Sequence, residues 1–247
     1  MKILITNDDG IDAYGLSLLE NLAKTVSDDI TTVVPMENRS GTSQAITLHK
    51  ELHFSNISPN RYVCSGNPAD CVMLALNLLF AENPPDLVLS GINHGMNASD
   101  DVGYSGTIGA AREASIVGIQ AIALSQQYGK SEIDFEVAQK FGKRVLDYAI
   151  SIKLPSRHVL NVNFPSKNVS EIKGVKSAIL DRHKTSDQIL PSNKADYYKI
   201  GPVYHHPEMS PKSDRFLLQK GYITFTPLLV DTTATELLNT ISDLTYE

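Results

Sequence analysis

The chain has 247 residues, two cysteines, no tryptophan and a formal net charge of −6 at pH 7. Its length is enough for one large α/β domain or two smaller domains with a hydrophobic core. The lack of any basic block argues against a groove for a nucleic-acid polymer and against a face for an anionic membrane. No run reaches the roughly 18 apolar residues that span a membrane, and the apolar start is too short for a secretory signal, so we expect a cytoplasmic protein.

Strand and helix patterns alternate through the first two-thirds of the chain, beginning with a short apolar strand over Lys2–Thr6. In chain order, the further predicted elements are a helix over 16–26, a strand over 30–34, extended pieces over 45–48 and 61–64, a helix over 68–80, a strand over 87–92, a helix over 105–116, a strand over 119–124, a helix over 133–152 and a strand over 159–164. This repeated βαβ order predicts an α/β fold with a doubly wound, Rossmann-like and mostly parallel sheet, covered by helices on both faces.

The two cysteines do not form a metal-binding or redox motif of closely spaced residues. Cys64 falls in a predicted strand and Cys71 in a predicted helix. Free cysteines are among the most buried residue types, so both are expected to be buried thiols.

After Pro165 the pattern changes to short polar segments with strand-like pieces over 175–180, 196–200 and 222–226 and a final helix over 233–244. We therefore divide the chain into a Rossmann-like catalytic core, 1–165, and a C-terminal extension with hairpins, 166–247. Irregular strands of this kind are poorly buried within one chain, and hairpin exchange between copies buries them, which predicts a homodimer or homotetramer. The segment 201–211 reads as the tip of such an arm, with Tyr204 and Met209 as anchors and His205 and His206 near the site of the neighbouring copy.

Asp8 and Asp9 follow the first predicted strand directly, and Gly10 supplies a turn. In an open α/β sheet, ligands bind outside the carboxyl ends of the strands. Two converging carboxylates repel each other unless a proton or a cation lies between them, and Mg²⁺ or Mn²⁺ prefers such oxygen ligands. The alternative is an Asx turn that only ends the strand.

Three further polar loops follow predicted strands and are expected at the same edge of the sheet. The loop at 38–41 offers Ser40 as a neutral oxygen ligand and Arg39 as a partner for phosphate, or it is a solvated turn. The loop at 90–97 offers the amides of Asn93 and Asn97; His94 in this loop is an acid or base, or an ordinary polar residue.

The loop at 100–107 leads into a Gly- and Ala-rich helix. Ser105, Gly106 and Thr107 are expected in its first turn, where free N–H groups and the helix dipole bind phosphate. The alternative is simple N-capping by Ser105.

In the order and spacing of its motifs the chain resembles the SurE (survival protein E) family of metal-dependent nucleotidases. The matching stretches are NDDG at 7–10, NRSG at 38–41, NPADCV at 67–72, SGINHGMN at 90–97 and YSGTIGAA at 104–111, with weaker matches in GYITFTPL at 221–228 and at Asp231 and Thr233. The resemblance implies one divalent metal per subunit, held by Asp8, Asp9, Ser40 and Asn93. It also implies a phosphate site made by Asn97, Ser105, Gly106 and Thr107, and dimers or tetramers built by the C-terminal segment.

Four residues depart from the family pattern, and none of them is an expected ligand. Tyr14 stands in place of a usual proline, Asn67 in place of threonine, Ala114 in place of glycine and His94 in place of a small residue. Tyr14 and His94 lie close in sequence to expected ligands. If these two departures have an effect, we expect it to be a change in the choice of substrate.

The favoured function is hydrolysis of nucleoside 5′-monophosphates to nucleoside and phosphate, with Asp9, in preference to Asp8, taking the proton of the attacking water. Activity on 3′-monophosphates or polyphosphate follows from the resemblance alone. One alternative is an aspartyl-phosphate phosphatase with Asp8 as nucleophile, which the adjacency of the two acids disfavours. Another is a non-catalytic nucleotide-binding regulator, which would not need paired acids.

Overall fold

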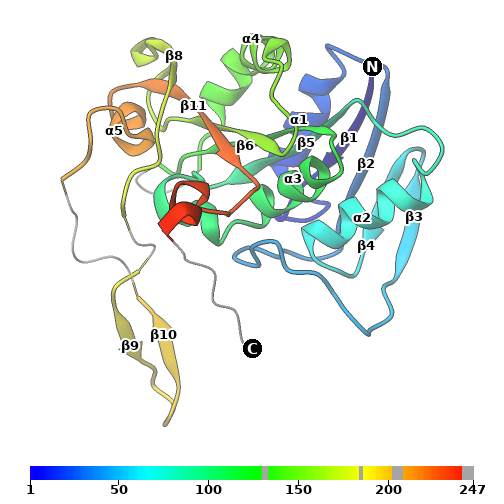
Figure 1. The fold of residues 1–247 in the computed structure, drawn as a ribbon, viewed down its shortest axis with the longest axis horizontal. Helices are drawn as coiled ribbons and strands as arrows, with labels where there is room; N and C mark the ends of the chain where they lie inside the picture. The colour runs from blue at the N-terminus through cyan, green and yellow to red at the C-terminus, as the bar shows by residue number, and fades with distance from the viewer. Residues whose placement is uncertain (130–132, 184–185, 202–207, 241–247) are drawn as a thin grey trace.

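The computed structural model describes residues 1–129, 133–183, 186–201 and 208–240. In this part of the chain nine strands form one sheet in the order β3-β4-β2-β1-β5-β6-β7-β11-β8 (Figure 1). The strands are β1 (Lys2–Thr6), β2 (Asp29–Pro35), β3 (Phe54–Ser58), β4 (Arg61–Cys64), β5 (Leu87–His94), β6 (Gln120–Gln126), β7 (His158–Phe164), β8 (Gly174–Ser177) and β11 (Tyr222–Leu229). The helices are α1 (Tyr14–Ala23), α2 (Pro68–Leu78), α3 (Gly106–Ile116), α4 (Glu136–Ser151) and α5 (Asp214–Gln219), with short 3₁₀ turns η1 (Ser99–Gly103), η2 (Val169–Glu171) and η3 (Thr235–Thr240).

The sheet is mostly parallel, as predicted. β1 lies between β2 and β5, and Ile3 is in register with Ile30 on one side and Leu87 on the other. β4, β6 and β7 continue the parallel arrangement outward, whereas β3 and β11 are antiparallel to their neighbours β4 and β7. The carboxyl ends of β1, β2 and β5 therefore meet at one edge.

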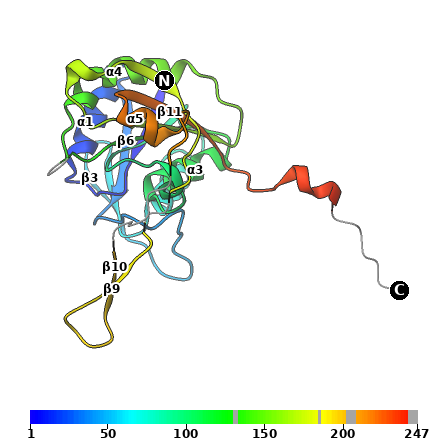
Figure 2. The ribbon, with the colours of Figure 1, turned by 90° about the vertical axis from the view of Figure 1, so that its left-hand side faces the viewer.

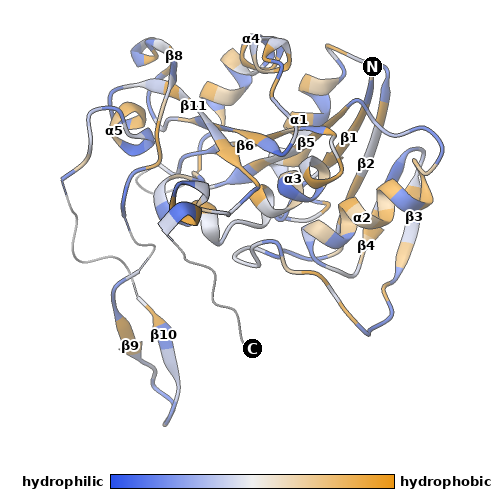
Figure 3. Ribbon diagram, viewed as in Figure 1, coloured by the Kyte–Doolittle hydropathy of each residue, from blue (hydrophilic) through white to orange (hydrophobic). Residues whose placement is uncertain are grey.

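Alternating side chains of the strands pack into two hydrophobic cores, one on each face of the sheet. Ile3 and Ile5 of β1 pack with α1 and α4, whereas Leu4 between them packs with α2 and α3. This alternation follows from the two-residue period of a strand and confirms the doubly wound architecture. Figure 3 shows the central strands coloured mainly as hydrophobic, as expected for strands that are covered on both faces.

Local hydrogen bonds mark the start of α2 and the end of α1. α2 begins with a capping box in which Asn67 and Asp70 exchange side-chain and backbone hydrogen bonds, with Pro68 in the first turn. α1 begins at Tyr14 and ends at Ala23, two residues earlier at the start and three earlier at the end than predicted. Its last turn is followed by Thr25, whose hydroxyl donates to the carbonyl oxygen of Leu22 and ends the helix.

The predicted extended piece over 45–48 is wrong, because this segment forms no strand. Instead β3 (Phe54–Ser58), which the sequence did not indicate, pairs antiparallel with β4. The turn between them contains Asn60 with a φ of 58°, a conformation that asparagine tolerates better than most residues. β3 is half-exposed and lacks the continuous apolar run by which the buried strands were recognised.

Beyond residue 165, β11 and β8 extend the main sheet past β7. A separate hairpin of β9 (Ile189–Pro191) and β10 (Tyr198–Ile200) projects away from the body of the molecule (Figures 1 and 2). The turn of this hairpin lies at 192–197. Most of the segment 201–211, which was predicted as the tip of an arm and includes Tyr204, His205 and His206, lies outside the described residues. The turn is made by Lys194 and Asp196, the latter with a φ of 62°.

Of the predicted last helix over 233–244, Thr235–Thr240 forms the 3₁₀ turn η3, the two residues before it are irregular, and 241–244 lie outside the described residues. In Figure 2 the segment that carries η3 extends away from the sheet. None of the helices in the described part of the chain is long and apolar enough to cross a membrane. The cytoplasmic location expected from the sequence stays a prediction.

Candidate functional site

Asp8 and Asp9 stand in a tight turn directly after β1. The side chain of Asn7 closes this turn: its amide donates to the carbonyl oxygen of Gly10 at 2.8 Å, and the Gly10 N–H donates back to the Asn7 amide oxygen at 3.3 Å. Gly10 has a φ of 95°, which favours glycine strongly. The turn sends the two carboxylates to different partners. Asp9 Oδ2 accepts the backbone N–H of His94 at 3.1 Å, and Asp8 Oδ1 accepts the hydroxyl of Thr107 at 2.6 Å.

Asp8 is almost completely buried, with 3% of its surface exposed. The pKa of this carboxyl is raised from 3.8 to about 7, chiefly by burial and also by the neighbouring charge of Asp9. The hydrogen bond from Thr107 acts in the opposite direction, as do backbone N–H groups of Asp8 and Thr107. Burial also raises the pKa of Asp9, while His94 lowers it. Two acids that are desolvated side by side favour either a shared proton or a bound cation.

The start of α3 packs directly against Asp8. A Cβ atom added at Gly106 would come within 2.9 Å of the Asp8 Cβ and 3.0 Å of its Oδ2, so only glycine fits here without a shift. Ser105 is the N-cap of the helix, and its hydroxyl oxygen accepts the N–H of Ile108 at 3.1 Å. Ser105 was predicted in the first turn of the helix, but it lies one residue before that turn. Its hydroxyl still has a hydrogen to donate.

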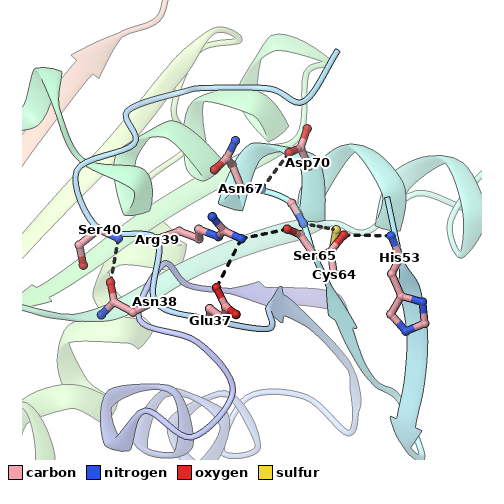
Figure 4. A network of polar contacts seen from close by, with 10 residues as sticks. Glu37, Asn38, Arg39, Ser40, His53, Cys64, Ser65, Asn67 and Asp70 are labelled. Atoms are coloured by element: carbon pink, nitrogen blue, oxygen red, sulfur yellow. Dashed lines mark hydrogen bonds and ion pairs between the residues drawn. The ribbon is translucent and has the colours of Figure 1, made fainter. Parts of the chain in front are cut away.

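The loop after β2 brings Ser40 to the site and turns Arg39 elsewhere. The Arg39 N–H donates to the carbonyl oxygen of Asp8 at 2.7 Å, which fixes the loop beside the turn after β1. The Arg39 guanidinium donates to the Ser65 carbonyl oxygen at 3.2 Å and lies 3.7 Å from a carboxylate oxygen of Glu37 (Figure 4). The expectation that Arg39 faces a phosphate is therefore wrong, because its charge is used to hold this loop to the one after β4.

Asn93 and His94 lie on β5 itself, which is longer than predicted and ends at His94. The pairing of β5 with β6 is interrupted between Ser90 and Asn93, where Gly91 approaches Leu124 so closely that a Cβ would meet its carbonyl oxygen at 2.2 Å. The Asn93 amide group donates to the Gly95 carbonyl oxygen at 2.8 Å, a bond that does not use the amide oxygen. The His94 ring nitrogen Nε2 accepts the N–H of Gly15 at 3.3 Å.

Asn97 is held by three polar side chains that the sequence analysis missed. Its side chain donates to the Ser125 hydroxyl at 2.8 Å, and its backbone N–H donates to the Asn163 amide oxygen at 2.8 Å. Asn161 and Asn163 also donate to the Asn97 carbonyl oxygen, at 2.7 and 3.0 Å. The sequence signal that could have identified Asn161 and Asn163 is their spacing of two positions within the mostly apolar strand β7.

These elements surround a cavity of about 440 Å³ at the carboxyl edge of the sheet. Five of the eight predicted site residues line it, namely Asp8, Ser40, Asn93, Asn97 and Ser105. The other three do not line the cavity but contact residues that do. Asp9 accepts a hydrogen bond from His94, and Gly106 and Thr107 contact Asp8. The rest of the lining consists of Gly41, His94, Gly95, Met96, Asp101, Tyr104, Gln127 and Tyr128, of which only His94 was considered from the sequence.

The donor set fits a hard divalent cation. It combines the buried carboxylate of Asp8 with neutral oxygens of Ser40 and Asn93, and Asp9 is the adjacent residue. Across the described ranges no group of three or more His, Cys, Asp or Glu side chains is placed to hold a metal. A cation at this site would thus depend on serine and asparagine oxygens, the kind of ligand that Mg²⁺ and Mn²⁺ accept.

The family model described as survival protein SurE matches residues 3–187 of the chain. The chain belongs to the SurE family. A 5′-nucleotidase SurE of Vibrio cholerae serotype O1 (strain El Tor Inaba N16961) is 38% identical to it over 244 residues, which cover 98% of this chain and 96% of the relative. A 5′-nucleotidase SurE of Vibrio parahaemolyticus is 39% identical over 241 residues, covering 96% and 92%. The crystal structure of the SurE protein from Aquifex aeolicus superposes with a TM-score of 0.84 at 31% identity over 98% of both chains.

Two of the four departures from the SurE pattern, Tyr14 and His94, pack against the same aromatic ring. The ring of Phe135 packs against Tyr14 at 5.3 Å and against His94 at 5.2 Å between ring centroids. His94 lines both the site cavity and a larger neighbouring cavity of about 950 Å³, which Tyr14 and Phe135 also line. Asn67 caps α2 and Ala114 is buried against the sheet, so these two departures serve the fold.

Proposed function

We propose that this chain hydrolyses nucleoside 5′-monophosphates to a nucleoside and inorganic phosphate, using one divalent metal cation per subunit, Mg²⁺ or Mn²⁺. The named relatives, 38% and 39% identical over almost the whole chain, are 5′-nucleotidases. The observation that carries the proposal is the position of Asp8. Its carboxylate is buried at the end of β1, yet it opens into the same cavity as Ser40, Asn93 and Asn97.

Asp8, Asp9, Ser40 and Asn93 are the proposed metal ligands. A cation bound there would polarise the phosphoryl oxygens and lower the pKa of a bound water. Thr107 orients Asp8 through its hydroxyl, and the N–H of His94 orients Asp9 through Oδ2. The remaining oxygen of Asp9, Oδ1, is the proposed acceptor for the proton of the attacking water.

Asn97, Ser105, Gly106 and Thr107 are the proposed phosphate-binding residues. The hydroxyl of Ser105 donates to a phosphoryl oxygen, because its own oxygen already accepts the Ile108 N–H. The free N–H groups at the start of α3 and the helix dipole favour negative charge at this place. The contribution of Thr107 passes through Asp8, to which its hydroxyl is bonded.

Release of inorganic phosphate from AMP by the purified full-length protein tests the proposal. We expect turnover with added Mg²⁺ or Mn²⁺, loss of turnover after chelation with EDTA, and recovery when the metal is returned. Binding of AMP without phosphate release would identify a nucleotide-binding regulator instead. A phosphorylated protein trapped by acid quench during turnover would indicate an aspartyl-phosphate phosphatase with Asp8 as nucleophile.

We further propose that the chain works as a homodimer or homotetramer, with the catalytic residues before residue 165 and the contacts between copies after it. The hairpin β9–β10 presents apolar side chains to solvent, with Ile200 78% and Tyr198 68% exposed. Leu237 and Leu238 on η3 are also more than half exposed. Side chains of this kind are typical of an interface between copies.

A further inference from the structure

Two tyrosines, Tyr104 and Tyr128, belong to the lining of the site cavity, and each is more than half exposed. Tyr104 directly precedes Ser105, the N-cap of α3 and a proposed phosphate-binding residue. Tyr128 follows β6 by two residues, and a Cβ atom added at Gly95 would meet its ring at 2.9 Å. Both tyrosines therefore border the place where the phosphoryl group is proposed to bind.

Hydrogen bonds fix the backbone at both tyrosines. The Ser43 N–H donates to the Tyr104 carbonyl oxygen at 2.8 Å, and the Tyr104 N–H donates to the Asp101 carbonyl oxygen at 2.9 Å. Tyr128 forms an antiparallel bridge with Ile133. A tyrosine on a fixed backbone has only two side-chain torsions to order when a ligand packs against it, so binding costs little conformational entropy. Exposed rings held in this way are suited to bind a flat organic group.

The charges in the lining argue against a substrate with several phosphates. As far as the structure describes it, the lining contains the carboxyl groups of Asp8 and Asp101 and neither lysine nor arginine. A cation at the proposed metal site and the start of α3 would together bind one phosphoryl group. A second phosphate would meet tyrosine and methionine side chains, with no described cation to compensate its charge. The cavity therefore favours a phosphate monoester of an uncharged organic group.

The neighbouring cavity of about 950 Å³ is the other place where aromatic rings could meet a base. It is lined by Tyr14 and Phe135, but its described lining includes none of the eight predicted site residues. His94 is the one residue that the described linings of the two cavities share. Tyr104, in contrast, is joined to Ser105 by a single peptide bond. The distance from the phosphate site thus favours Tyr104 and Tyr128.

We propose that Tyr104 and Tyr128 bind the base of the substrate, packing their rings against its flat faces while the phosphoryl group lies at the start of α3. The proposal rests on the proposed function and names what its site selects. The preferred substrate is a monoester that carries a base, ahead of a sugar phosphate without a base and ahead of inorganic polyphosphate. Stacking on an aromatic ring is available to every base, because each has a π-face.

Phosphate release from AMP and from ribose 5-phosphate, which has the same sugar ester without the base, tests the selection in the full-length protein. We expect kcat/KM of the wild type to be about tenfold or more higher for AMP. Tyr104→Leu and Tyr128→Leu should each reduce this ratio by raising KM for AMP, with ribose 5-phosphate unaffected. The Phe variants at both positions keep the ring and should keep the ratio, as should Tyr14→Leu in the neighbouring cavity.

Three kinetic results would overturn the proposal. The first is an equal kcat/KM for AMP and ribose 5-phosphate in the wild type. The second is a ratio that Tyr14→Leu removes and the variants of Tyr104 and Tyr128 retain, which would place the base in the neighbouring cavity. The third is release of phosphate from tripolyphosphate as fast as from AMP.

Saturation-transfer NMR with adenosine, which carries no phosphate, tests base binding without turnover. We expect transfer to the base protons with the wild type and with Tyr14→Leu, and its loss in the double variant Tyr104→Leu/Tyr128→Leu. No transfer with the wild type, or equal transfer with the double variant, would overturn the proposal. If the wild type releases phosphate from no ester, the proposed function fails, while the adenosine spectra still decide whether the two tyrosines bind a base.

Discussion

The carboxyl edge of the sheet and the hairpin β9–β10 differ in the kind of side chain that each places in an unfavourable environment. At the edge, polar side chains are buried: Asp8 is 3% exposed, and its bond to Thr107 joins residues 99 positions apart. In the hairpin, apolar side chains are exposed, as Ile200 is at 78%. A buried carboxylate is stabilised by a bound cation or proton, and an exposed apolar strand is stabilised by packing against another protein surface. The first region thus points to a small charged ligand and the second to another copy of the chain.

The comparison is tested most severely by the Asp8→Asn substitution, which keeps the shape of the side chain and removes its charge. We expect phosphate release to fall by roughly three orders of magnitude, because the residue is a proposed metal ligand. Asp147→Asn, which breaks an exposed pair with Lys143 on α4, is the matched control and should leave turnover unchanged. Near-normal turnover of Asp8→Asn at saturating metal would contradict the role given to this edge.

For the hairpin, the Ile200→Asp substitution places a charge on the most exposed of its apolar side chains. We expect the assembly to dissociate to monomers at micromolar concentration, because the charge would be desolvated in an interface. Ile57→Asp on β3, another exposed isoleucine at 48%, is the control and should leave the assembly intact. Light scattering measures both. A wild-type protein that is already monomeric and fully active would contradict the role of the hairpin.

Within the edge, Thr107→Val separates the positioning of Asp8 from the stability of the helix. The substitution removes the 2.6 Å bond to Asp8 at nearly constant volume, and we expect turnover to fall about 10- to 100-fold with a small change in melting temperature. Thr224→Val is the control, because the buried Thr224 hydroxyl has no hydrogen-bond partner within the described residues. Loss of stability with retained specific activity would show that Thr107 matters only for the fold.

The pH dependence of stability tests the burial of Asp8 directly. A carboxyl whose pKa rises from 3.8 to about 7 on folding favours the folded state at low pH, and this contribution is lost as the pH rises toward 7. In the metal-free protein we therefore expect the free energy of unfolding to fall between pH 5 and pH 8. The fall should be about 2 kcal/mol smaller in Asp8→Asn, measured by urea unfolding in EDTA. Parallel pH curves for the two proteins would contradict the burial of this charge.

The position of the site residues at the edge of the sheet was predictable because it depends on short sequence patterns. An apolar strand followed by NDDG places two acids at a strand end, and the repeated βαβ order brings the loops after β1, β2 and β5 to one side. The partners inside that site were not predictable in the same way. That Thr107 bonds to Asp8, or that Asn161 and Asn163 hold Asn97, depends on how α3 and β7 pack, which no sequence period encodes.

Outside the edge, prediction failed where tertiary pairing overrides local pattern. β3 is half-exposed and is ordered by its partner β4, while α5 is only six residues long and packs on β11. The turn of the hairpin β9–β10, which uses Lys194 and Asp196, was not predicted, and the predicted tip at 201–211 lies mostly outside the described residues. Arg39 was misread because its partner, Ser65, comes from a distant loop.

Direct binding of Mn²⁺, measured by isothermal titration calorimetry of the metal-free protein, tests the central claim without relying on turnover. The account predicts one site per chain in the wild type, loss of that site in Asp8→Asn, and retention in the Asp147→Asn control. It also predicts proton release on binding near pH 6, because the cation displaces the proton held by Asp8 below its pKa of about 7. Absence of binding by the wild type, or equal binding by Asp8→Asn, would contradict the claim that this edge of the sheet is a metal site.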